Sequence, residues 1–504
     1  MENRPQWGSR AGFILAAAGS AIGLGNIWRF PAVAYENGGG AFFLPYLFAL
    51  LTAGIPLLIL EFTIGHKYKG SAPLSLARIN KKFEWIGWWQ VAIAFVIATY
   101  YAVIIAWAMS YSIYSFNLNW GNDTEGFLFS KYLNLADTPG QVGSLVPGVF
   151  IPLLFVWLIT LGVLIKGIRR GIEAANKIML PTLLVLFIII VIRAVTLDGA
   201  IDGLNAFFKP NWDMIFNGKV WVAAYGQIFF SLSIGFAIMV TYSSYLSKKS
   251  DITNNAFITG FANSGFELLA GIGVFSILGF MAMQQGVSID NVVSSGVGLA
   301  FVVFPQIINQ FPAFNGFFGF LFFASLVLAG LTSLISIVET YVSGVQDRFK
   351  ISRTKSVLIG GGLSAIISIL FATRGGLFFL DVTDYFINNF GVALAGLIEI
   401  IAVAWFAKEL RNLQDHANSV SDMRLGAWWR VSLSIITPIV LGIMMFDNIR
   451  TNIAENYGGY ETWFVSAYGW VIAAAVIILG VVFSFVKWNK KAYTQSNDGK
   501  GVSQ

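Results

Sequence analysis

The first apolar stretch of the chain, FILAAAGSAIGLGNIWRFP, holds polar side chains within a glycine-rich sequence. Gly19, Gly23 and Gly25 weaken a helix by about 1 kcal/mol each relative to alanine, which favours a break. In lipid, broken backbone needs other partners, and cations or a polar substrate could supply them. Such glycines are also typical of closely packed helices. Asn26 and Arg29 favour a binding site, because buried polar groups in a membrane are costly without partners.

A second interrupted stretch, WVAAYGQIFFSLSIGFAIMVTY, places Gln227, Ser231, Ser233 and Gly235 within an aromatic and aliphatic helix. It lies five expected membrane spans after the first. Interrupted segments at corresponding positions of two halves are typical of the binding sites of transporters built from inverted repeats. The two stretches therefore predict one site at the middle of a membrane.

The composition predicts that lipid is the solvent for the helices that position these residues. Of 504 residues, 56% are hydrophobic and 12% are charged, about half the charged fraction of a soluble domain. The absence of cysteine excludes disulfides and thiolate metal sites, and His66 and His416 are the only histidines. No phosphate-binding loop is present, and no nucleophile lies beside a base, which argues against an ATP-driven pump and against an enzyme.

Apolar runs long enough to cross about 30 Å of hydrocarbon predict about twelve spans. They lie near 11–36, 41–66, 87–116, 148–166, 173–196, 219–246, 253–284, 317–346, 356–373, 380–408, 429–447 and 463–487. Basic residues fall in alternate loops, so the positive-inside rule predicts that residues 1–10 and 488–504 are cytoplasmic. The loops also explain the net charge of +6, without a nucleic-acid partner.

Four motifs in order resemble the neurotransmitter:sodium symporter family, in its prokaryotic-like amino-acid transporter branch. They are GSAIGLGNIWRFP at 19–31, ENGGGAFFLPY at 36–46, GQIFFSLSIGF at 226–236 and AGLTSLISI at 329–337. The resemblance covers about residues 5–410. It implies the LeuT-type fold, an all-α membrane protein with five-helix inverted repeats at 11–196 and 219–408, broken first and sixth spans, and two added spans at 429–487.

The resemblance also implies two sodium sites built from oxygen ligands. The first maps onto Ala21, Asn26, Ser231 and Asn263, together with the substrate carboxylate. The second maps onto Gly19, Ile22, Ala329, Thr332 and Ser333. Hard oxygens suit an alkali cation that gives up its hydration shell. Read without the resemblance, Thr332 and Ser333 are more typical of hydroxyls that bond back to their own helix.

The resemblance implies that the protein lies in the cell membrane. It also implies that the substrate is a neutral amino acid. The amides of Leu24 and Gly25 and the hydroxyl of Tyr101 would hold its carboxylate, because helix N-termini favour negative charge. Carbonyls of Ala21, Phe230 and Ser231, with the Ser233 side chain, would hold the ammonium. The expected side-chain pocket is lined by Ile97, Tyr101, Phe230, Ser233, Phe236, Ser333 and Ile337. Ser20 stands where amine transporters of the family have an aspartate.

Two gates and one flexible helix follow from the same resemblance. Arg29 and Asp384 match the outer gate. Arg4 and Asp347 match the inner gate, supported by Trp7 and Tyr245. Gly171 and Pro181 match a Gly-x9-Pro feature that would let the fifth span unwind, because proline removes a backbone hydrogen bond and glycine loosens the turn.

Glu267 occupies the position where chloride-dependent members of the family have an uncharged residue, and the other positions of that chloride site map to Tyr46, Gln227 and Ser231. A carboxylate there would replace chloride, and its protonation on the return step would make the carrier a proton antiporter.

The sequence thus predicts alternating-access import of a small to medium neutral, aliphatic amino acid, driven by sodium and independent of chloride. No obligatory protein partner is evident. A channel and a transport-dead sensor of the same fold are the alternatives.

Overall fold

The computed structural model describes residues 4–488, and in this part of the chain the only extended pairing is two isolated bridges. Ten helical segments are apolar and long enough to cross a membrane. They are Gly40–Tyr68, Lys81–Asn117, Pro147–Ile165, Ile168–Val195, Thr253–Gln285, Asn315–Phe349, Arg353–Ala372, Gly376–Phe406, Ala427–Gly459 and Thr462–Phe485. The all-α polytopic architecture predicted from the sequence is confirmed.

The first span is broken where the glycines predict it. Helix α1 (Arg10–Ala21) is followed by α2 (Leu24–Trp28) and α3 (Phe30–Glu36), and the two parts meet at an angle of 54°. The Ser9 hydroxyl caps α1 by accepting a hydrogen bond from the Gly12 amide at 3.0 Å. Ile22 and Gly23 form the break, so the last carbonyls of α1 and the first amides of α2 lack helical partners.

The sixth span is broken as well. Helix α12 (Gly218–Ser231) and helix α13 (Ile238–Ser244) are each too short to cross a membrane alone. Between them, Ser233, Gly235 and Ala237 adopt positive φ angles of 54°, 85° and 69°. The Gly235 amide donates to the Glu61 carboxylate at 2.8 Å, which satisfies one backbone group that the break frees.

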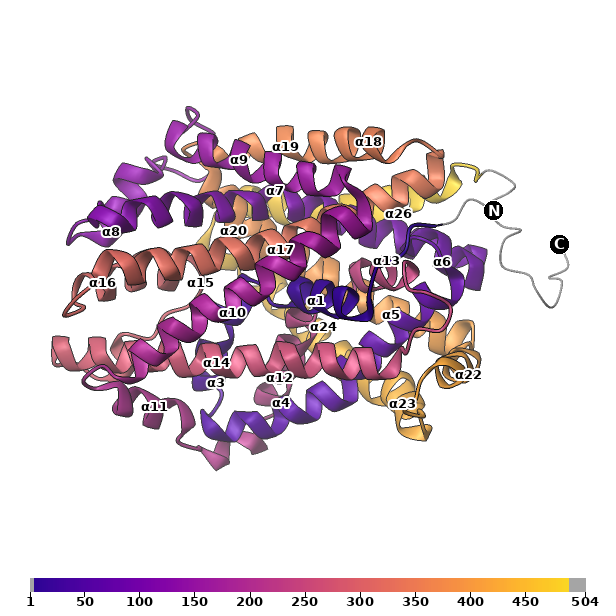
Figure 1. The fold of residues 1–504 in the computed structure, drawn as a ribbon, viewed down its shortest axis with the longest axis horizontal. Helices are drawn as coiled ribbons and strands as arrows, with labels where there is room; N and C mark the ends of the chain where they lie inside the picture. The colour runs from indigo at the N-terminus through magenta and orange to yellow at the C-terminus, as the bar shows by residue number, and fades with distance from the viewer. Residues whose placement is uncertain (1–3, 489–504) are drawn as a thin grey trace, which may run out of the picture.

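The broken helices lie inside a cage of long helices (Figure 1). Helix α1 contacts α10 (Ala174–Val195), α14 (Thr253–Gln285) and α17 (Asn315–Phe349), and α13 packs against α5 (Ile55–Tyr68). Helix α17 runs beside α7 (Glu84–Tyr114) along the long axis. The spans that contain α5, α7, α14 and α17 are mostly buried in the protein, so they can carry polar side chains away from lipid, whereas most of the span of α10 is not buried.

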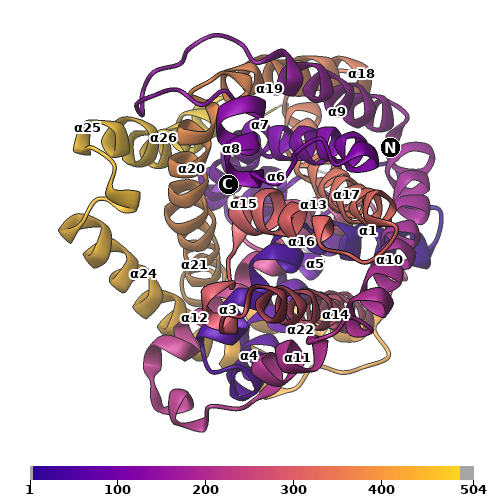
Figure 2. The same cartoon turned by 90° about the vertical axis from the view of Figure 1, so that its left-hand side faces the viewer.

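The last two spans stand at the edge of the molecule. Figure 2 shows α24 (Thr437–Ala454) and α26 (Val471–Phe485) outside α20 (Gly376–Phe386) and α21 (Ala393–Ile401). Helix α24 also contacts α12, the first half of the broken sixth span. This position agrees with sequence motifs that end near residue 410.

Short helices in the connections were not predicted from the sequence. They are α6 (Ala72–Ile79), α11 (Ala200–Phe208), α16 (Phe304–Asn309) and α22 (Leu410–Val420). The chain's two histidines meet between α5 and α22, where His66 Nδ1 and His416 Nε2 are 2.9 Å apart. Burial, Lys67 and Lys69 lower the pKa of His416 to about 4, so its ring is neutral at pH 7.

Candidate functional site

A cavity of about 210 Å³ lies where the breaks of the first and sixth spans face each other. It is lined by Ser20, Ala21, Gly23, Leu24, Gly25, Asn26, Trp28, Arg29, Ile97, Tyr100, Tyr101, Ile104, Gln227, Phe230, Ser231, Ser233, Phe236, Ser333, Ile337, Asp384 and Asn388. The structure therefore brings together every residue that the sequence predicts for the substrate site. Trp28, Tyr100, Ile104 and Asn388 also line the cavity and were not predicted.

One side of the cavity carries the start of α2. The Leu24 amide points to the Tyr101 hydroxyl at 3.5 Å, and a side chain on Gly25 would meet open space. A Cβ on Gly23 would lie 3.1 Å from the Ser333 hydroxyl and 3.3 Å from that of Tyr101. Gly23 therefore keeps room free beside two hydroxyls and the positive end of a short helix.

Two hydroxyls also converge on the end of α1. Ser233 Oγ and Ser333 Oγ donate to the Ser20 carbonyl at 2.9 Å and 3.2 Å. The resemblance implied a role for the Ala21 carbonyl, and in the structure the neighbouring Ser20 carbonyl accepts these two hydrogen bonds. Both residues end α1, where carbonyls have no partner within the helix.

Asn26, Ser231 and Asn263 form a buried cluster beside the cavity. Asn26 Nδ2 donates to Asn263 Oδ1 at 2.8 Å, and Asn263 Nδ2 donates to Ser231 Oγ at 2.5 Å. Asn26 Oδ1 accepts the Gly23 amide at 2.9 Å. These oxygens come from α2, α12 and α14, which are far apart in sequence. They could turn toward one cation held between the three helices.

Glu267 lies one helical turn beyond Asn263 on α14 and is fully buried. Its carboxylate accepts hydrogen bonds from the Tyr46 hydroxyl and from Gln227 Nε2, the latter at 2.6 Å. The family resemblance places Tyr46 and Gln227 in the same predicted chloride-type site as Glu267. The carboxylate thus sits beside the Asn26, Ser231 and Asn263 cluster and can offset positive charge there.

Gly19 lies against Thr332, as expected for the second oxygen cluster. A Cβ on Gly19 would lie 3.4 Å from the Cβ of Thr332. The Thr332 hydroxyl donates to the carbonyl of Ala329 at 3.0 Å and to that of Leu328 at 3.2 Å, so it bonds to its own helix in this structure. Its lone pairs remain available to an ion.

The four residues predicted for the inner gate meet at the end of α17. Arg4 forms an ion pair with Asp347 at 2.9 Å, and its guanidinium lies 4.9 Å from the centre of the Tyr245 ring. Trp7 packs edge-on against Tyr245 and donates to the Tyr242 carbonyl at 2.8 Å. These contacts join the four residues into one network.

Other residues reinforce that network and were not predicted. Tyr245 donates to Glu339 at 2.7 Å, and Arg353 forms an ion pair with Glu339 at 2.7 Å. The Glu173 carboxylate accepts the Gly8 amide at 2.5 Å and the Ser9 hydroxyl at 2.8 Å. A charged residue gives no sequence signal of a partner that lies on another element of the fold.

On the other side of the cavity, Arg29 and Asp384 line the same opening but form no ion pair in the described structure. The Arg29 guanidinium instead lies 4.9 Å from the centre of the Phe230 ring, and Asp384 accepts Asn388 Nδ2 at 2.8 Å. The predicted outer pair is therefore separated, whereas the inner pair is joined. A carrier open toward the Arg29 side would have this arrangement.

The fifth span begins with an irregular turn. Residues Ile168–Glu173 form a wide π-helical turn, and Pro181 lies inside α10. A Cβ on Gly171 would lie 2.0 Å from the Val163 carbonyl oxygen, so only glycine fits. The segment predicted to unwind is thus bounded by two residues that weaken a helix.

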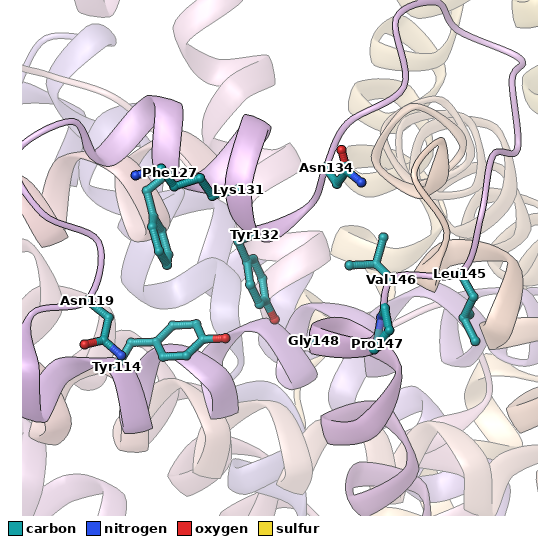
Figure 3. Close-up of a pocket in the computed structure, with 10 residues that line it drawn as sticks. All are labelled: Tyr114, Asn119, Phe127, Lys131, Tyr132, Asn134, Leu145, Val146, Pro147 and Gly148. Carbon is teal, nitrogen blue, oxygen red and sulfur yellow. The ribbon is translucent and has the colours of Figure 1, made fainter.

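A larger hollow of about 390 Å³ lies between the start of α9 (Pro147–Ile165) and the loop before it. Figure 3 shows Tyr114, Phe127 and Tyr132 around it, with Lys131 and two asparagines at its rim. None of the predicted site residues lines this hollow. The cavity at the helix breaks is the stronger candidate, because it alone joins both breaks to the buried polar clusters.

Two broken helices around a central cavity, with one gate network joined and the opposite pair apart, define a polytopic membrane transporter. The model of the sodium:neurotransmitter symporter family matches residues 4–127 and 121–491. The chain belongs to this family and is a sodium-dependent symporter rather than an enzyme.

Three similar proteins illustrate the range of the family. An uncharacterized sodium-dependent transporter of Methanocaldococcus jannaschii is 43% identical, over 96% of this chain and 98% of that protein. The sodium- and chloride-dependent neutral and basic amino acid transporter B(0+) of Homo sapiens is 29% identical, over 96% of this chain and 86% of that protein. The sodium- and chloride-dependent GABA transporter 2 of Mus musculus is 31% identical, over the same shares.

Proposed function

We propose that this protein imports a small to medium neutral amino acid together with sodium by alternating access. The cavity at the two helix breaks carries this proposal. Its lining combines backbone and hydroxyl groups with aliphatic side chains such as Ile97, Ile104 and Ile337. Ser20, rather than an acid, belongs to this lining. An amine without a carboxylate would offer no anionic acceptor to the Leu24 and Gly25 amides, which disfavours it.

The substrate's carboxylate binds the amides of Leu24 and Gly25 and the Tyr101 hydroxyl in this proposal. Its ammonium binds the carbonyls at the end of α1 and those of Phe230 and Ser231, with the Ser233 hydroxyl. One sodium ion binds Ala21, Asn26, Ser231 and Asn263 beside the carboxylate. A second binds Gly19, Ile22, Ala329, Thr332 and Ser333. These groups are the partners that unwound backbone and a desolvated ion require.

The orientation in the cell membrane follows from charge. Basic loop residues such as Lys69, Arg169 and Arg353 lie on the Arg4 side, so we place this side in the cytoplasm. Residues 11–196 and 219–408 then form the two inverted repeats, which rock about the cavity. In the structure Arg4 is paired with Asp347, whereas Arg29 and Asp384 form no ion pair. The state is thus the one that receives substrate from outside.

A channel and a transport-dead sensor of the same fold are the two alternatives. A channel would need a continuous polar path, but the lining of the cavity does not extend to the network of Arg4, Trp7 and Tyr245. A sensor would bind sodium and amino acid without moving them, and vesicle uptake separates it from a carrier.

The proposal is tested by thermal unfolding of the purified protein with each of the twenty amino acids, in sodium and in potassium. A ligand that binds only the folded state raises the free energy of unfolding, by about 2.7 kcal/mol at a hundredfold excess over its Kd. The midpoint of thermal unfolding rises with it. We expect small aliphatic amino acids to stabilise the protein in sodium alone. Stabilisation by an amine without a carboxylate, or equally in potassium, would contradict the proposal.

At the outer gate, Asp384→Ala is expected to leave sodium-dependent stabilisation intact but reduce uptake by roughly tenfold or more, because Arg29 loses its partner for closure. Asp381→Asn is a matched control, since Asp381 lies one turn away on α20 and binds Tyr457 and Tyr460 instead. Undiminished uptake by Asp384→Ala would show that the pair is no gate.

A further inference from the structure

Asn176 is a buried amide on α10 whose oxygen has no partner. Its side chain is fully buried, and Asn176 Nδ2 donates to the Ile172 carbonyl at 2.9 Å. This bond ties the nitrogen to its own helix and directs Oδ1 away from it. No hydrogen bond reaches Oδ1 from the described residues. An orphan buried carbonyl oxygen costs about 1–3 kcal/mol, so it calls for an explanation.

The orphan oxygen faces the second oxygen cluster. A Cβ built on Gly19 would lie 2.5 Å from Asn176 Oδ1 and 3.4 Å from the Thr332 Cβ. Asn176 and Thr332 therefore approach Gly19 from α10 and α17 on the same side. Helix α1 contacts both of these helices, so the three elements enclose one buried place. Amide oxygens are hard ligands of the same type as the backbone carbonyls that coordinate alkali cations in broken-helix transporters.

We propose that Asn176 Oδ1 is an additional ligand of the sodium ion held between Gly19 and Thr332. This inference rests on the proposed second sodium site and adds a ligand from the fifth span. Bound sodium then satisfies the oxygen that the protein leaves without a partner. The nitrogen's bond to Ile172 keeps the amide from turning away, so the ligand is held in place before the ion arrives.

The position of Asn176 links ion release to helix movement. Asn176 lies between Gly171 and Pro181, within the segment predicted to unwind, and one turn after the irregular turn Ile168–Glu173. Unwinding breaks the helix that holds Asn176 and withdraws Oδ1 from the ion. The site loses a ligand at the moment water reaches it, so the same movement opens the path and lowers the affinity for sodium.

The test is a sodium titration of thermal unfolding for the full chain, without amino acid. Under this condition the first site lacks its proposed carboxylate ligand, and the second dominates. Asn176→Leu is expected to raise the half-saturating sodium concentration about tenfold or more, because the ion loses one ligand. Its midpoint without sodium should change little, because the variant removes an oxygen without a partner together with one hydrogen bond to the Ile172 carbonyl. Asn176→Asp should keep the half-saturating concentration at or below that of the wild type.

Thr160→Val is the matched control, since Thr160 is fully buried on α9 and bonds back to the Val156 carbonyl. We expect its sodium titration to match the wild type. If Asn176→Leu does not fold, Asn176→Ala gives the same comparison. The assignment of Asn176 as a ligand would be overturned if the leucine or alanine variant had an unchanged half-saturating concentration, with or without a lower midpoint. Absence of any sodium effect in the wild type would instead overturn the proposed function and this ligand with it.

Discussion

Asn26→Ala and Asn263→Ala are each expected to abolish sodium-dependent amino-acid binding while the protein still folds. Both side chains lie in the buried cluster beside the cavity and are joined by a hydrogen bond of 2.8 Å. Alanine removes an oxygen that would replace the hydration shell of the ion. Losing such a ligand should raise the half-saturating sodium concentration by roughly a hundredfold, about 3 kcal/mol. The measurement is a sodium titration of substrate-induced stabilisation.

Thr259→Val is the matched control for this pair. Thr259 lies one turn before Asn263 on α14, is fully buried, and donates to the Asn255 carbonyl at 2.8 Å. We expect normal sodium dependence in this variant. Normal dependence in Asn26→Ala or Asn263→Ala would remove that residue from the sodium site.

Glu267→Ser is expected to convert chloride-independent uptake into uptake that requires chloride. In the wild type, the carboxylate accepts Gln227 Nε2 at 2.6 Å beside the first sodium cluster and supplies negative charge in a low dielectric. Serine leaves that space uncharged, and a chloride ion can fill it with Tyr46, Gln227 and Ser231. Uptake by Glu267→Ser in gluconate should fall at least about tenfold and recover in chloride.

Glu399→Gln is the control, because Glu399 is another buried carboxylate, bound to Gln90 at 2.5 Å on different helices. Its uptake should remain independent of chloride. The wild type should also accelerate when the vesicle interior is acidified, since protonated Glu267 leaves no unpaired charge on the sodium-free return. Glu267→Ser should lose that acceleration. A chloride requirement in the wild type would refute the assignment of Glu267.

The helix breaks could be predicted from the sequence, because glycine and buried polar residues leave a local signal. Gly19 and Gly23 mark the first break, and Gly235 marks the second. Most span limits followed from hydropathy within about six residues, but the span expected at 429–447 extends over Ala427–Gly459. The short helices α11 and α22 were missed because each is amphipathic rather than apolar throughout and lies between spans.

Partners across the fold could not be predicted from local pattern. Asn26 and Asn263 are 237 positions apart, and only the resemblance to a family grouped them. Glu339 and Arg353 reinforce the Arg4 network through contacts that no periodicity encodes. Asn176 reads as an ordinary polar residue in a membrane helix until the structure shows that its oxygen has no partner. Likewise, the resemblance pairs Arg29 with Asp384, but the sequence does not predict that they have other partners in this structure.

Uptake into vesicles tests the central claim most directly. The purified protein, reconstituted into lipid vesicles with potassium inside, would be given labelled alanine or leucine in external sodium gluconate. We expect saturable accumulation above the external concentration that collapses when a sodium ionophore dissipates the gradient. Asn263→Ala vesicles should show none. Accumulation that persists without a sodium gradient, or binding without accumulation, would contradict a sodium-coupled amino-acid carrier.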